Sequence, residues 1–315
     1  MRDARAAGIK AIVATSLAFG LCNCAVTTHE ARMSPLGTPR GSAAMEAHLD
    51  EPGTVELETI AVADWSVPYS GLVNFDDPKV KAAGLVDHDE PIQIFLHVIR
   101  HPKRGLYLVD TGVEKALHED PGTSAFGPLV RMKMDLSKMT IHVDTRDWIA
   151  AQRRPIDGVF FTHLHVDHIA GLADVPRMVP LYTGAGEAGD TKLLNLFVFR
   201  STDKALEGCG PLLEWPAQRD PDGRFDTVTD VFGDEMVWAL GTPGHTVGST
   251  AYVVRTPKGP VLLTGDASHT RWGWDNGVVP GTFSTDIEGS KKSLANLKAL
   301  AARHPKMEVR LGHQR

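Results

Sequence analysis

The chain has 315 residues, of which 42% are hydrophobic and 23% are charged. This ordinary globular composition excludes a disordered protein, a collagen-like fibre and a disulfide-rich miniprotein. The 33 Lys and Arg residues are outnumbered by 39 Asp and Glu residues, which gives a formal net charge of -6. Because no basic excess is available to neutralise a run of phosphates, we expect no nucleic-acid partner.

The N-terminal segment has the pattern of an export signal. Basic side chains occur at Arg2, Arg5 and Lys10, and residues 11–25 carry no charge. A basic segment followed by a short apolar one is typical of a signal peptide, and this stretch is too short to span a bilayer comfortably. We therefore expect a signal peptide over residues 1–25 and an exported protein, periplasmic or secreted. The alternative is a flexible or buried N-terminal helix.

The three cysteines lead to two further expectations. Cys22 and Cys24 lie at the end of the apolar segment, where a bacterial lipoprotein carries its acylated cysteine. A lipid anchor at Cys24, which would hold the protein on a membrane, is therefore an alternative to release. Cys209 is the single cysteine in the rest of the chain, so we expect a buried free thiol and no intramolecular disulfide.

Residues 26–53 contain several Pro and Gly residues and no sustained hydrophobic periodicity. Such composition is typical of connecting segments. We therefore expect a flexible linker over residues 26–53 and a folded domain over residues 54–315.

Apolar runs then mark the elements of this domain. We expect two strands joined by a tight turn to open it, at 92–100 and 106–109. A short helix at 144–152 precedes a continuous apolar run at 158–161, which is typical of a strand buried on both faces. Further strands are expected at 236–240, 249–254, 260–263 and 307–311, and a helix at 287–302 would place Leu294, Leu297 and Leu300 on one face. The pattern predicts an α/β protein with two sheets sandwiched between helices.

The segment after the buried strand at 158–161 is rich in metal-binding side chains. Four potential ligands occur between this strand and an expected helix: His163, His165, Asp167 and His168. In an extended stretch, His163, His165 and Asp167 would converge while His168 faced a second position, which suits two adjacent metal ions. Burying these polar groups together would cost several kcal/mol unless a cation balanced them.

Three later residues stand in similar places, each directly after an expected strand: His245, Asp266 and His313. Taken alone, the first two are equally typical of turns. His313 lies near the end of the chain, where segments fray, and taken alone it indicates nothing.

Together these seven residues resemble the ligand pattern of the metallo-β-lactamase superfamily, and the resemblance covers roughly residues 54–315. It implies an αββα sandwich with the site at one edge, where the two sheets meet. It also implies that His163, His165 and His245 hold one divalent metal ion, that Asp167, His168 and His313 hold another, and that Asp266 bridges both. Zinc is the default metal, although the same ligand types suit iron or manganese.

Residues 242–246 and 265–270 look most like the N-acyl homoserine lactonase branch of that superfamily. A tyrosine usually stands three residues after the bridging aspartate in that branch, whereas this chain has His269. The resemblance implies hydrolysis of a small lactone or a related ester by a hydroxide that two metal ions share. Asp167, or His269 if it points into the site, could then protonate the departing group.

Other activities remain open on the same fold. They are thioester hydrolysis in the manner of hydroxyacylglutathione hydrolases, phosphotriester hydrolysis, and oxygenation by a single iron ion; a non-catalytic binding protein is a further alternative.

Two more sequence features, at residues 184–189 and at Asp110, have simpler interpretations. Residues 184–189 match G-x-G-x-x-G but lack the surroundings of a dinucleotide site, so we expect a turn into a helix. Asp110 either forms a turn or orients a ligand histidine through its second ring nitrogen.

Overall fold

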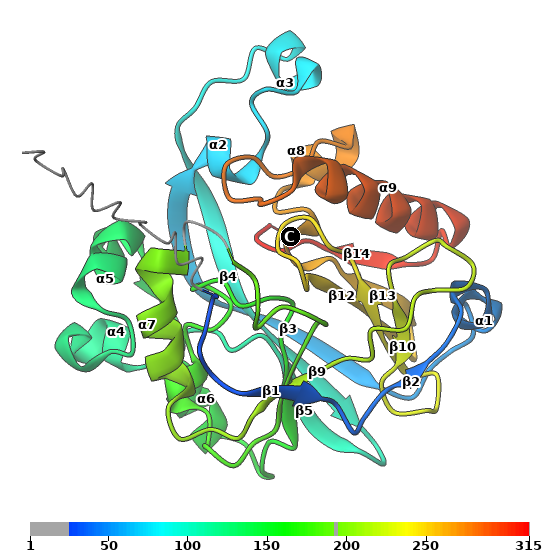
Figure 1. Ribbon diagram of the computed structural model, residues 1–315, viewed down its shortest axis with the longest axis horizontal. Helices are drawn as coiled ribbons and strands as arrows, with labels where there is room; N and C mark the ends of the chain where they lie inside the picture. The colour runs from blue at the N-terminus through cyan, green and yellow to red at the C-terminus, as the bar shows by residue number, and fades with distance from the viewer. Residues whose placement is uncertain (1–24, 192–194, 315) are drawn as a thin grey trace, which may run out of the picture.

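The computed structural model of the protein describes residues 25–191 and 195–314, which form two β-sheets packed face to face (Figure 1). The first sheet contains, in spatial order, β1 (Ala31–Met33), β9 (Leu212–Glu214), β8 (Leu181–Thr183), β7 (Gly158–Phe160), β5 (Gly105–Val109), β4 (Asp89–His101), β3 (Glu56–Pro68) and β6 (Thr140–Ile141). The second contains β14 (Glu308–Arg310), β13 (Gly259–Leu263), β12 (Thr250–Thr256), β11 (Val237–Gly241), β10 (Val228–Asp230) and β2 (Thr38–Pro39).

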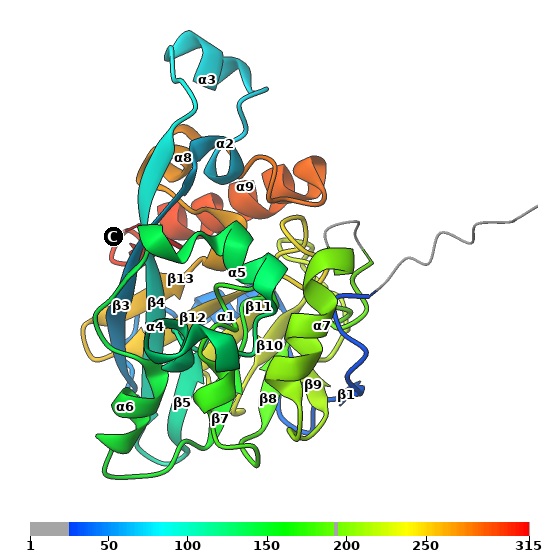
Figure 2. The ribbon, with the colours of Figure 1, turned by 90° about the vertical axis from the view of Figure 1, so that its left-hand side faces the viewer.

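Helices cover the outer faces of both sheets (Figures 1 and 2). Those over the first sheet are α4 (Ala116–Glu119), α5 (Pro128–Met134), α6 (Thr145–Ala150) and α7 (Asn195–Leu206), with the short 3-10 turns η1 (Pro121–Thr123), η2 (Leu136–Lys138) and η3 (Leu172–Asp174) between them in sequence. On the side of the second sheet are α1 (Ser42–Ala47), α8 (Arg271–Asn276), α9 (Ile287–Arg303) and η4 (Gly265–Ala267). The small helices α2 (Tyr69–Leu72) and α3 (Pro78–Ala82) follow β3. This is the expected αββα sandwich.

Alternation along the strands divides the apolar side chains of the described residues between the two faces of each sheet. In β12, Ala251 and Val253 face the helices of the second sheet, whereas Tyr252 and Val254 face the first sheet. Because successive side chains of a strand point to opposite faces, the apolar run at residues 251–254 contributes to both cores. The same period holds in β5, where Leu106 and Leu108 belong to the outer core of the first sheet.

Most of the elements expected from the sequence are present. The hairpin of β4 and β5, the helix α6, the strands β7 and β11 to β14, and the helix α9 lie at the expected places. The hairpin does not open the domain, however, because β3 precedes it and pairs with β4 along its whole length. Polar residues interrupt the sequence of β3, and much of this strand is only half buried, so its apolar pattern is weak.

The expectation of a flexible linker at residues 26–53 is wrong. In this segment β1 pairs with β9 of the first sheet, and β2 pairs with β10 of the second. Met45 and Leu49 are buried in the outer core of the second sheet. The Pro and Gly residues therefore mark turns between very short elements, which are too short to show a hydrophobic period.

Two other expectations from the N-terminal half of the sequence have different outcomes. The proposed signal peptide and the lipid anchor at Cys24 fall on residues 1–24, outside the described residues. Cys209 is a free thiol, as expected, but it is only partly buried, and its Sγ atom accepts a hydrogen bond from Arg177 over 3.5 Å. Within residues 25–191 and 195–314, no helix has both the length and the apolar character needed to cross a bilayer.

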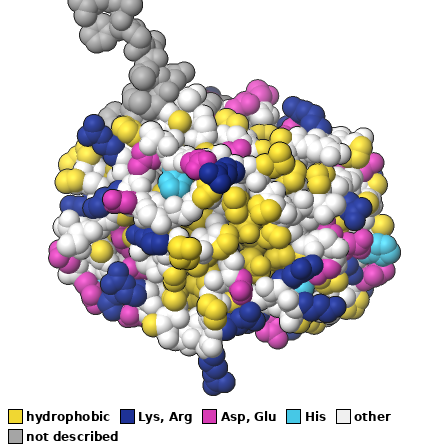
Figure 3. Space-filling model, turned by 60° about the horizontal axis from the view of Figure 1, so that its bottom comes forward, with side chains coloured by type: hydrophobic (Ala, Val, Ile, Leu, Met, Phe, Trp, Pro, Cys, Tyr) yellow, Lys and Arg dark blue, Asp and Glu magenta, His cyan; other side chains and the backbone are white. Residues whose placement is uncertain are grey.

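Charges of both signs are interspersed on the underside of the molecule, around a central area of hydrophobic side chains (Figure 3). A surface that attracts nucleic acid usually shows a continuous field of positive charge. The mixed signs on this face are in keeping with the acidic composition, and the absence of a nucleic-acid partner stays a prediction.

Candidate metal centre

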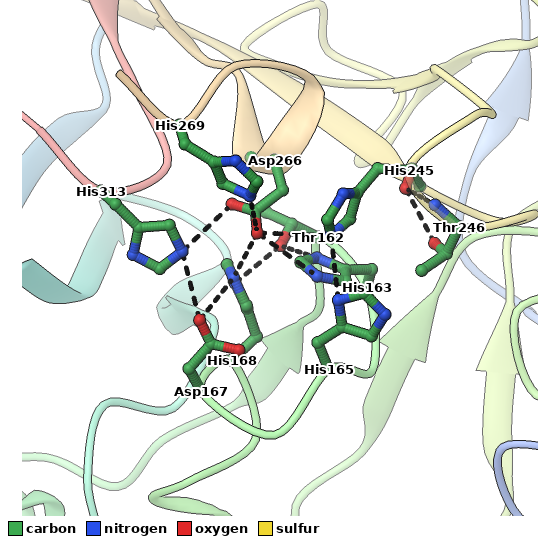
Figure 4. A network of polar contacts seen from close by, with 12 residues as sticks. Thr162, His163, His165, Asp167, His168, His245, Thr246, Asp266, His269 and His313 are labelled. Carbon is green, nitrogen blue, oxygen red and sulfur yellow. Dashed lines mark hydrogen bonds and ion pairs between the residues drawn. The ribbon is translucent and has the colours of Figure 1, made fainter. Parts of the chain in front are cut away.

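The seven residues singled out in the sequence meet at one edge of the sandwich (Figure 4). His163, His165, Asp167 and His168 follow β7 of the first sheet, and the others follow strands of the second sheet: His245 after β11, Asp266 after β13 and His313 after β14. Because these strands end at the same edge, residues far apart in the sequence come together there.

Their side chains form two groups of possible ligands. The first consists of His163, His165 and His245, and the second of Asp167, His168, Asp266 and His313; within each group the ligand atoms lie within 4.8 Å of one another. Asp266 joins the two. Its Oδ2 atom is 3.4 Å from His245 Nε2 and 3.3 Å from His168 Nε2, and its Oδ1 atom is 3.4 Å from His313 Nε2.

One geometric expectation fails here. Asp167 does not converge with His163 and His165, because the chain leaves the extended conformation at His165. The backbone nitrogens of His168 and Ile169 donate to the carbonyl oxygen of His165 over 3.1 and 3.2 Å. Because of this turn, Asp167 lies in the second group. The short 3-10 turn η3 follows, where a helix was expected.

The chemistry of these residues fits divalent metal ions. Three buried atoms have no hydrogen-bond partner: His163 Nε2, His168 Nε2 and Asp266 Oδ1. Leaving a buried polar atom unsatisfied costs about 1–3 kcal/mol, so three in one place call for another partner. Imidazole nitrogen and carboxylate oxygen are zinc ligands, and a metal ion in each group would satisfy all three atoms.

Burial and charge prepare the side chains for this role. Burial lowers the pKa of His165 to about 4 and those of His163 and His245 well below the ordinary value, so these rings are neutral bases at neutral pH. Burial alone would raise the pKa of Asp266, but the neighbouring His269 and His168 outweigh it and lower the pKa. The carboxylate therefore stays ionised.

Positive charge is favoured in the second group. Burial acts to lower the pKa of His313, but Asp266 and Asp167 outweigh burial and raise it to about 10. The pKa of His168 is raised in the same way, by Asp266 and Asp110 against burial. A divalent cation bound to the second group would be stabilised by the same carboxylates.

The contacts of Asp110 test the two interpretations of this residue. Its Oδ2 atom accepts a hydrogen bond from His168 Nδ1 over 2.8 Å, and its Oδ1 atom accepts one from the backbone nitrogen of Thr162 over 2.8 Å. Asp110 has a φ of 58°, so it forms a tight turn as well. Asp110 thus fills both of the roles that the sequence left open, and it leaves Nε2 of the candidate ligand His168 facing the site.

Comparisons with known proteins agree with this geometry. The family profile described as the metallo-beta-lactamase superfamily matches residues 90–313. The chain belongs to this superfamily. The N-acyl homoserine lactonase AttM of Agrobacterium fabrum is 26% identical over 236 residues, which cover 72% of this chain and 83% of the relative.

Two solved structures share the metallo-β-lactamase fold. One is an N-acyl homoserine lactone hydrolase with the product N-hexanoyl-L-homoserine at its catalytic metal center; its TM-score is 0.57 at 18% identity, over 83% of this chain and 94% of that one. The other is AidC, a dizinc quorum-quenching lactonase, with a TM-score of 0.54 at 15% identity, over 89% of this chain and 91% of that one. At these identities the likeness shows the fold.

His269 lies inside the site, as the sequence left open. Its Nε2 atom is 2.8 Å from Asp266 Oδ2, its Nδ1 atom is 3.3 Å from the carbonyl oxygen of Leu72, and its ring is 1% exposed. The ring centre is 5.2 Å from that of His245 and 5.3 Å from that of His313. His269 therefore contacts the shared aspartate from a position between the two groups.

His313 is held firmly despite its place near the end of the chain. Its Nδ1 atom donates to the carbonyl oxygen of Gln93 over 2.9 Å, and its own carbonyl oxygen accepts from the backbone nitrogen of Gln93 over 2.9 Å. Gln314 in turn bonds Glu90 and the backbone of Arg271. The expected fraying is absent at His313.

The sequence reasoning missed Glu187. Residues 184–189 form the expected turn, although no helix begins within residues 184–191. Glu187 in this turn is 1% exposed, and its carboxylate bonds the loops that carry the first group. Burial raises the pKa of Glu187 to about 7, although hydrogen bonds from Thr246 and Leu164 oppose the shift. No local spacing could have shown this role, because every partner is distant in the sequence or on another element.

Solvent reaches the centre on one side. The side chain of Asp167 is 19% exposed and His165 is also partly exposed, whereas the side chains of His163, His245, Asp266 and His313 are at most 3% exposed. A small substrate would therefore approach from the side of His165 and Asp167.

Proposed function

We propose that this protein is a metal-dependent hydrolase that opens lactones or cleaves related carboxylic esters at a centre for two divalent metal ions, with zinc as the first choice. The observation that carries the proposal is the pair of ligand groups that Asp266 joins, since its Oδ2 atom lies close to both His245 and His168. The likeness to AttM, an N-acyl homoserine lactonase, supports the lactone as the bond that breaks.

Two bound divalent ions would polarise the substrate carbonyl and lower the pKa of a water molecule to about 7, so that a nucleophile is available at neutral pH. The chain's own residues would do the rest. Asp266 would set the spacing of the two groups through both of its oxygens, and Asp110 would fix the ring of His168.

Breaking the ester bond needs a proton for the departing alkoxide. Asp167 is the carboxylate of the centre that solvent reaches, and it lies 3.2 Å from His313 Nε2, so it could carry a proton to the substrate side of the centre. His269 is the second candidate, because its ring lies inside the site with Nε2 2.8 Å from Asp266 Oδ2. Proton donation of this kind contributes about 100- to 10,000-fold to a rate.

The experiment is proton release in a pH-stat from zinc-reconstituted protein. Acyl homoserine lactones, simple lactones, aryl esters, acyl thioesters and a phosphotriester are offered in parallel, with and without a chelator. Turnover of lactones or carboxylic esters that the chelator abolishes supports the proposal. Turnover confined to thioesters or phosphotriesters would reject the lactone assignment, and no turnover together with one iron ion per chain would favour an oxygenase.

We also propose that the protein is exported, either released or held by a lipid on Cys24. Val26 is already 3% exposed, and its backbone nitrogen bonds Asp190, so the folded body begins directly after the proposed signal. A lipid on Cys24 would then hold the domain close to the membrane, without a tether. Mass spectrometry of the protein from its native host tests this, because an intact Met1 would contradict export.

A further inference from the structure

A buried carboxylate lies beneath the first group of ligands. Glu187 Oε1 accepts a hydrogen bond from the backbone nitrogen of Leu164 over 2.8 Å. Glu187 Oε2 accepts one from Thr246 Oγ1 over 2.7 Å and one from the backbone nitrogen of Gly248 over 2.9 Å. All of these donors are buried, so the contacts are shielded from water.

The donors belong to the two loops that carry the first group. Leu164 stands between His163 and His165 on the loop after β7, and Thr246 follows His245 on the loop after β11. These loops come from different sheets. One oxygen of Glu187 therefore holds the histidine pair of the first sheet, and the other holds the single histidine of the second.

The backbone around Glu187 is packed too closely to shift. A Cβ atom on Gly184 would lie 1.8 Å from the carbonyl oxygen of Gly248. A Cβ atom on Gly248 would lie 2.5 Å from the Cβ atom of Glu187. Both glycines are thus required for the turn at 184–189 to meet the loop after β11. The carboxylate sits at the closest approach of the two segments.

We infer that Glu187 is a positioning residue for the first metal ion, which sets the distance between His245 and the pair His163 and His165. Its bonds reach the loops of this group, whereas Asp110 serves the second group through His168. Each group thus has its own carboxylate outside the ligand shell. Loss of such a partner typically weakens metal binding 10- to 100-fold.

The test is Glu187→Gln, which keeps the size of the side chain. An amide has one acceptor oxygen, so either Leu164 or Gly248 loses the acceptor for its backbone N–H. Zn²⁺ and Co²⁺ are titrated into the metal-free protein against a competing chelator, without substrate. We expect one of two bound ions to be held about 10- to 100-fold more weakly. Two ions held as tightly as in the wild type would overturn the inference.

The matched control is Glu114→Gln. Glu114 is also a buried carboxylate, 2% exposed, that accepts hydrogen bonds from a hydroxyl group, on Ser124, and from a backbone nitrogen, of Ala125. We expect this variant to lower the melting temperature of the metal-free protein as Glu187→Gln does and to bind both ions normally. Equal losses of metal affinity in the two variants would mean that Glu187 is merely structural.

A second pair of variants keeps the test valid if Glu187→Gln does not fold. Thr246→Val removes one donor to the carboxylate, and Thr246→Ser retains the hydroxyl group. We expect Thr246→Val to bind one of the two metal ions more weakly than the wild type, and Thr246→Ser to bind both ions as the wild type does. Equal metal affinities in the two variants would contradict the inference. Because metal binding is measured without substrate, failure of the lactonase assignment would leave this result unaffected.

Discussion

The Nδ1 atom of His168 donates a hydrogen bond to Asp110 over 2.8 Å, and this contact turns Nε2 of the same ring toward Asp266, 3.3 Å away. A single buried aspartate at the end of β5 thus selects the tautomer and the direction of a ligand that follows β7. The second group of ligands depends on this pair.

Replacing Asp110 with Asn tests that dependence. The amide can still accept from Thr162 with its oxygen, but the group facing His168 Nδ1 is then a donor, so the ring is no longer held as a ligand. We expect affinity for one metal ion to fall about 10- to 100-fold in a chelator competition. Asp144→Asn is the control, because Asp144 is an equally buried carboxylate that caps α6.

Removing His313 should affect the two groups differently. The second group would keep only Asp167, His168 and Asp266, whereas the first would keep all three histidines. We expect His313→Ala to retain one ion and lose the other during dialysis against a chelator, as measured by elemental analysis. His304→Ala, a histidine that bonds Glu46 and Asp50, should retain both ions. Equal loss of both ions from His313→Ala would argue against two separable groups.

His269→Ala separates proton donation from metal binding. If His269 protonates the leaving group, kcat for a lactone should fall about 100-fold or more while two metal ions remain bound. The turnover number and the metal content are measured on the same preparation. An unchanged kcat would remove His269 from the mechanism and leave Asp167 as the proton donor.

Glu46 tests whether the N-terminal segment belongs to the fold. Burial would raise its pKa, but hydrogen bonds from Arg303 and Arg224 outweigh burial and lower it to about 2. Because the folded pKa lies below the ordinary value of 4.5, the stabilisation is complete above that value and is lost as the pH falls toward 2.

We therefore expect Glu46→Gln to destabilise the metal-free protein by about 1–3 kcal/mol at neutral pH, and by progressively less in acid. Chemical denaturation at several pH values measures the difference from the wild type. A difference that stays constant from neutral pH to about pH 3 would show that the ion pairs of α1 contribute nothing to stability.

The sequence predicted the part of the fold that rests on continuous apolar runs. Residues 158–161 and 249–254 are apolar almost throughout and became β7 and β12, which are buried on both faces. The short elements of residues 26–53 have no such signal. They are recognisable only through their partners, such as β9 for β1, which are far away in the chain.

Most of the candidate ligands were predictable for a similar reason, since they follow the buried strands β7, β11 and β13; His313 follows β14, which is only partly buried. The positions of Asp167 and Glu187 could not be predicted, because hydrogen bonds determine them. The turn at His165 moved Asp167 to the second group, and the position of Glu187 depends on donors from two other loops. Spacing along the chain carries no information about either contact.

The most direct test of the account is the number of metal ions per chain, measured by elemental analysis of the purified protein and of its Asp266→Ala variant. Asp266 belongs to the second ligand group and contacts His245 of the first, so it joins the two. We expect two divalent ions in the wild-type protein, and at most one, loosely held, in the variant. A single iron ion in the wild type, or two ions retained by Asp266→Ala, would contradict a dinuclear centre built on these seven residues.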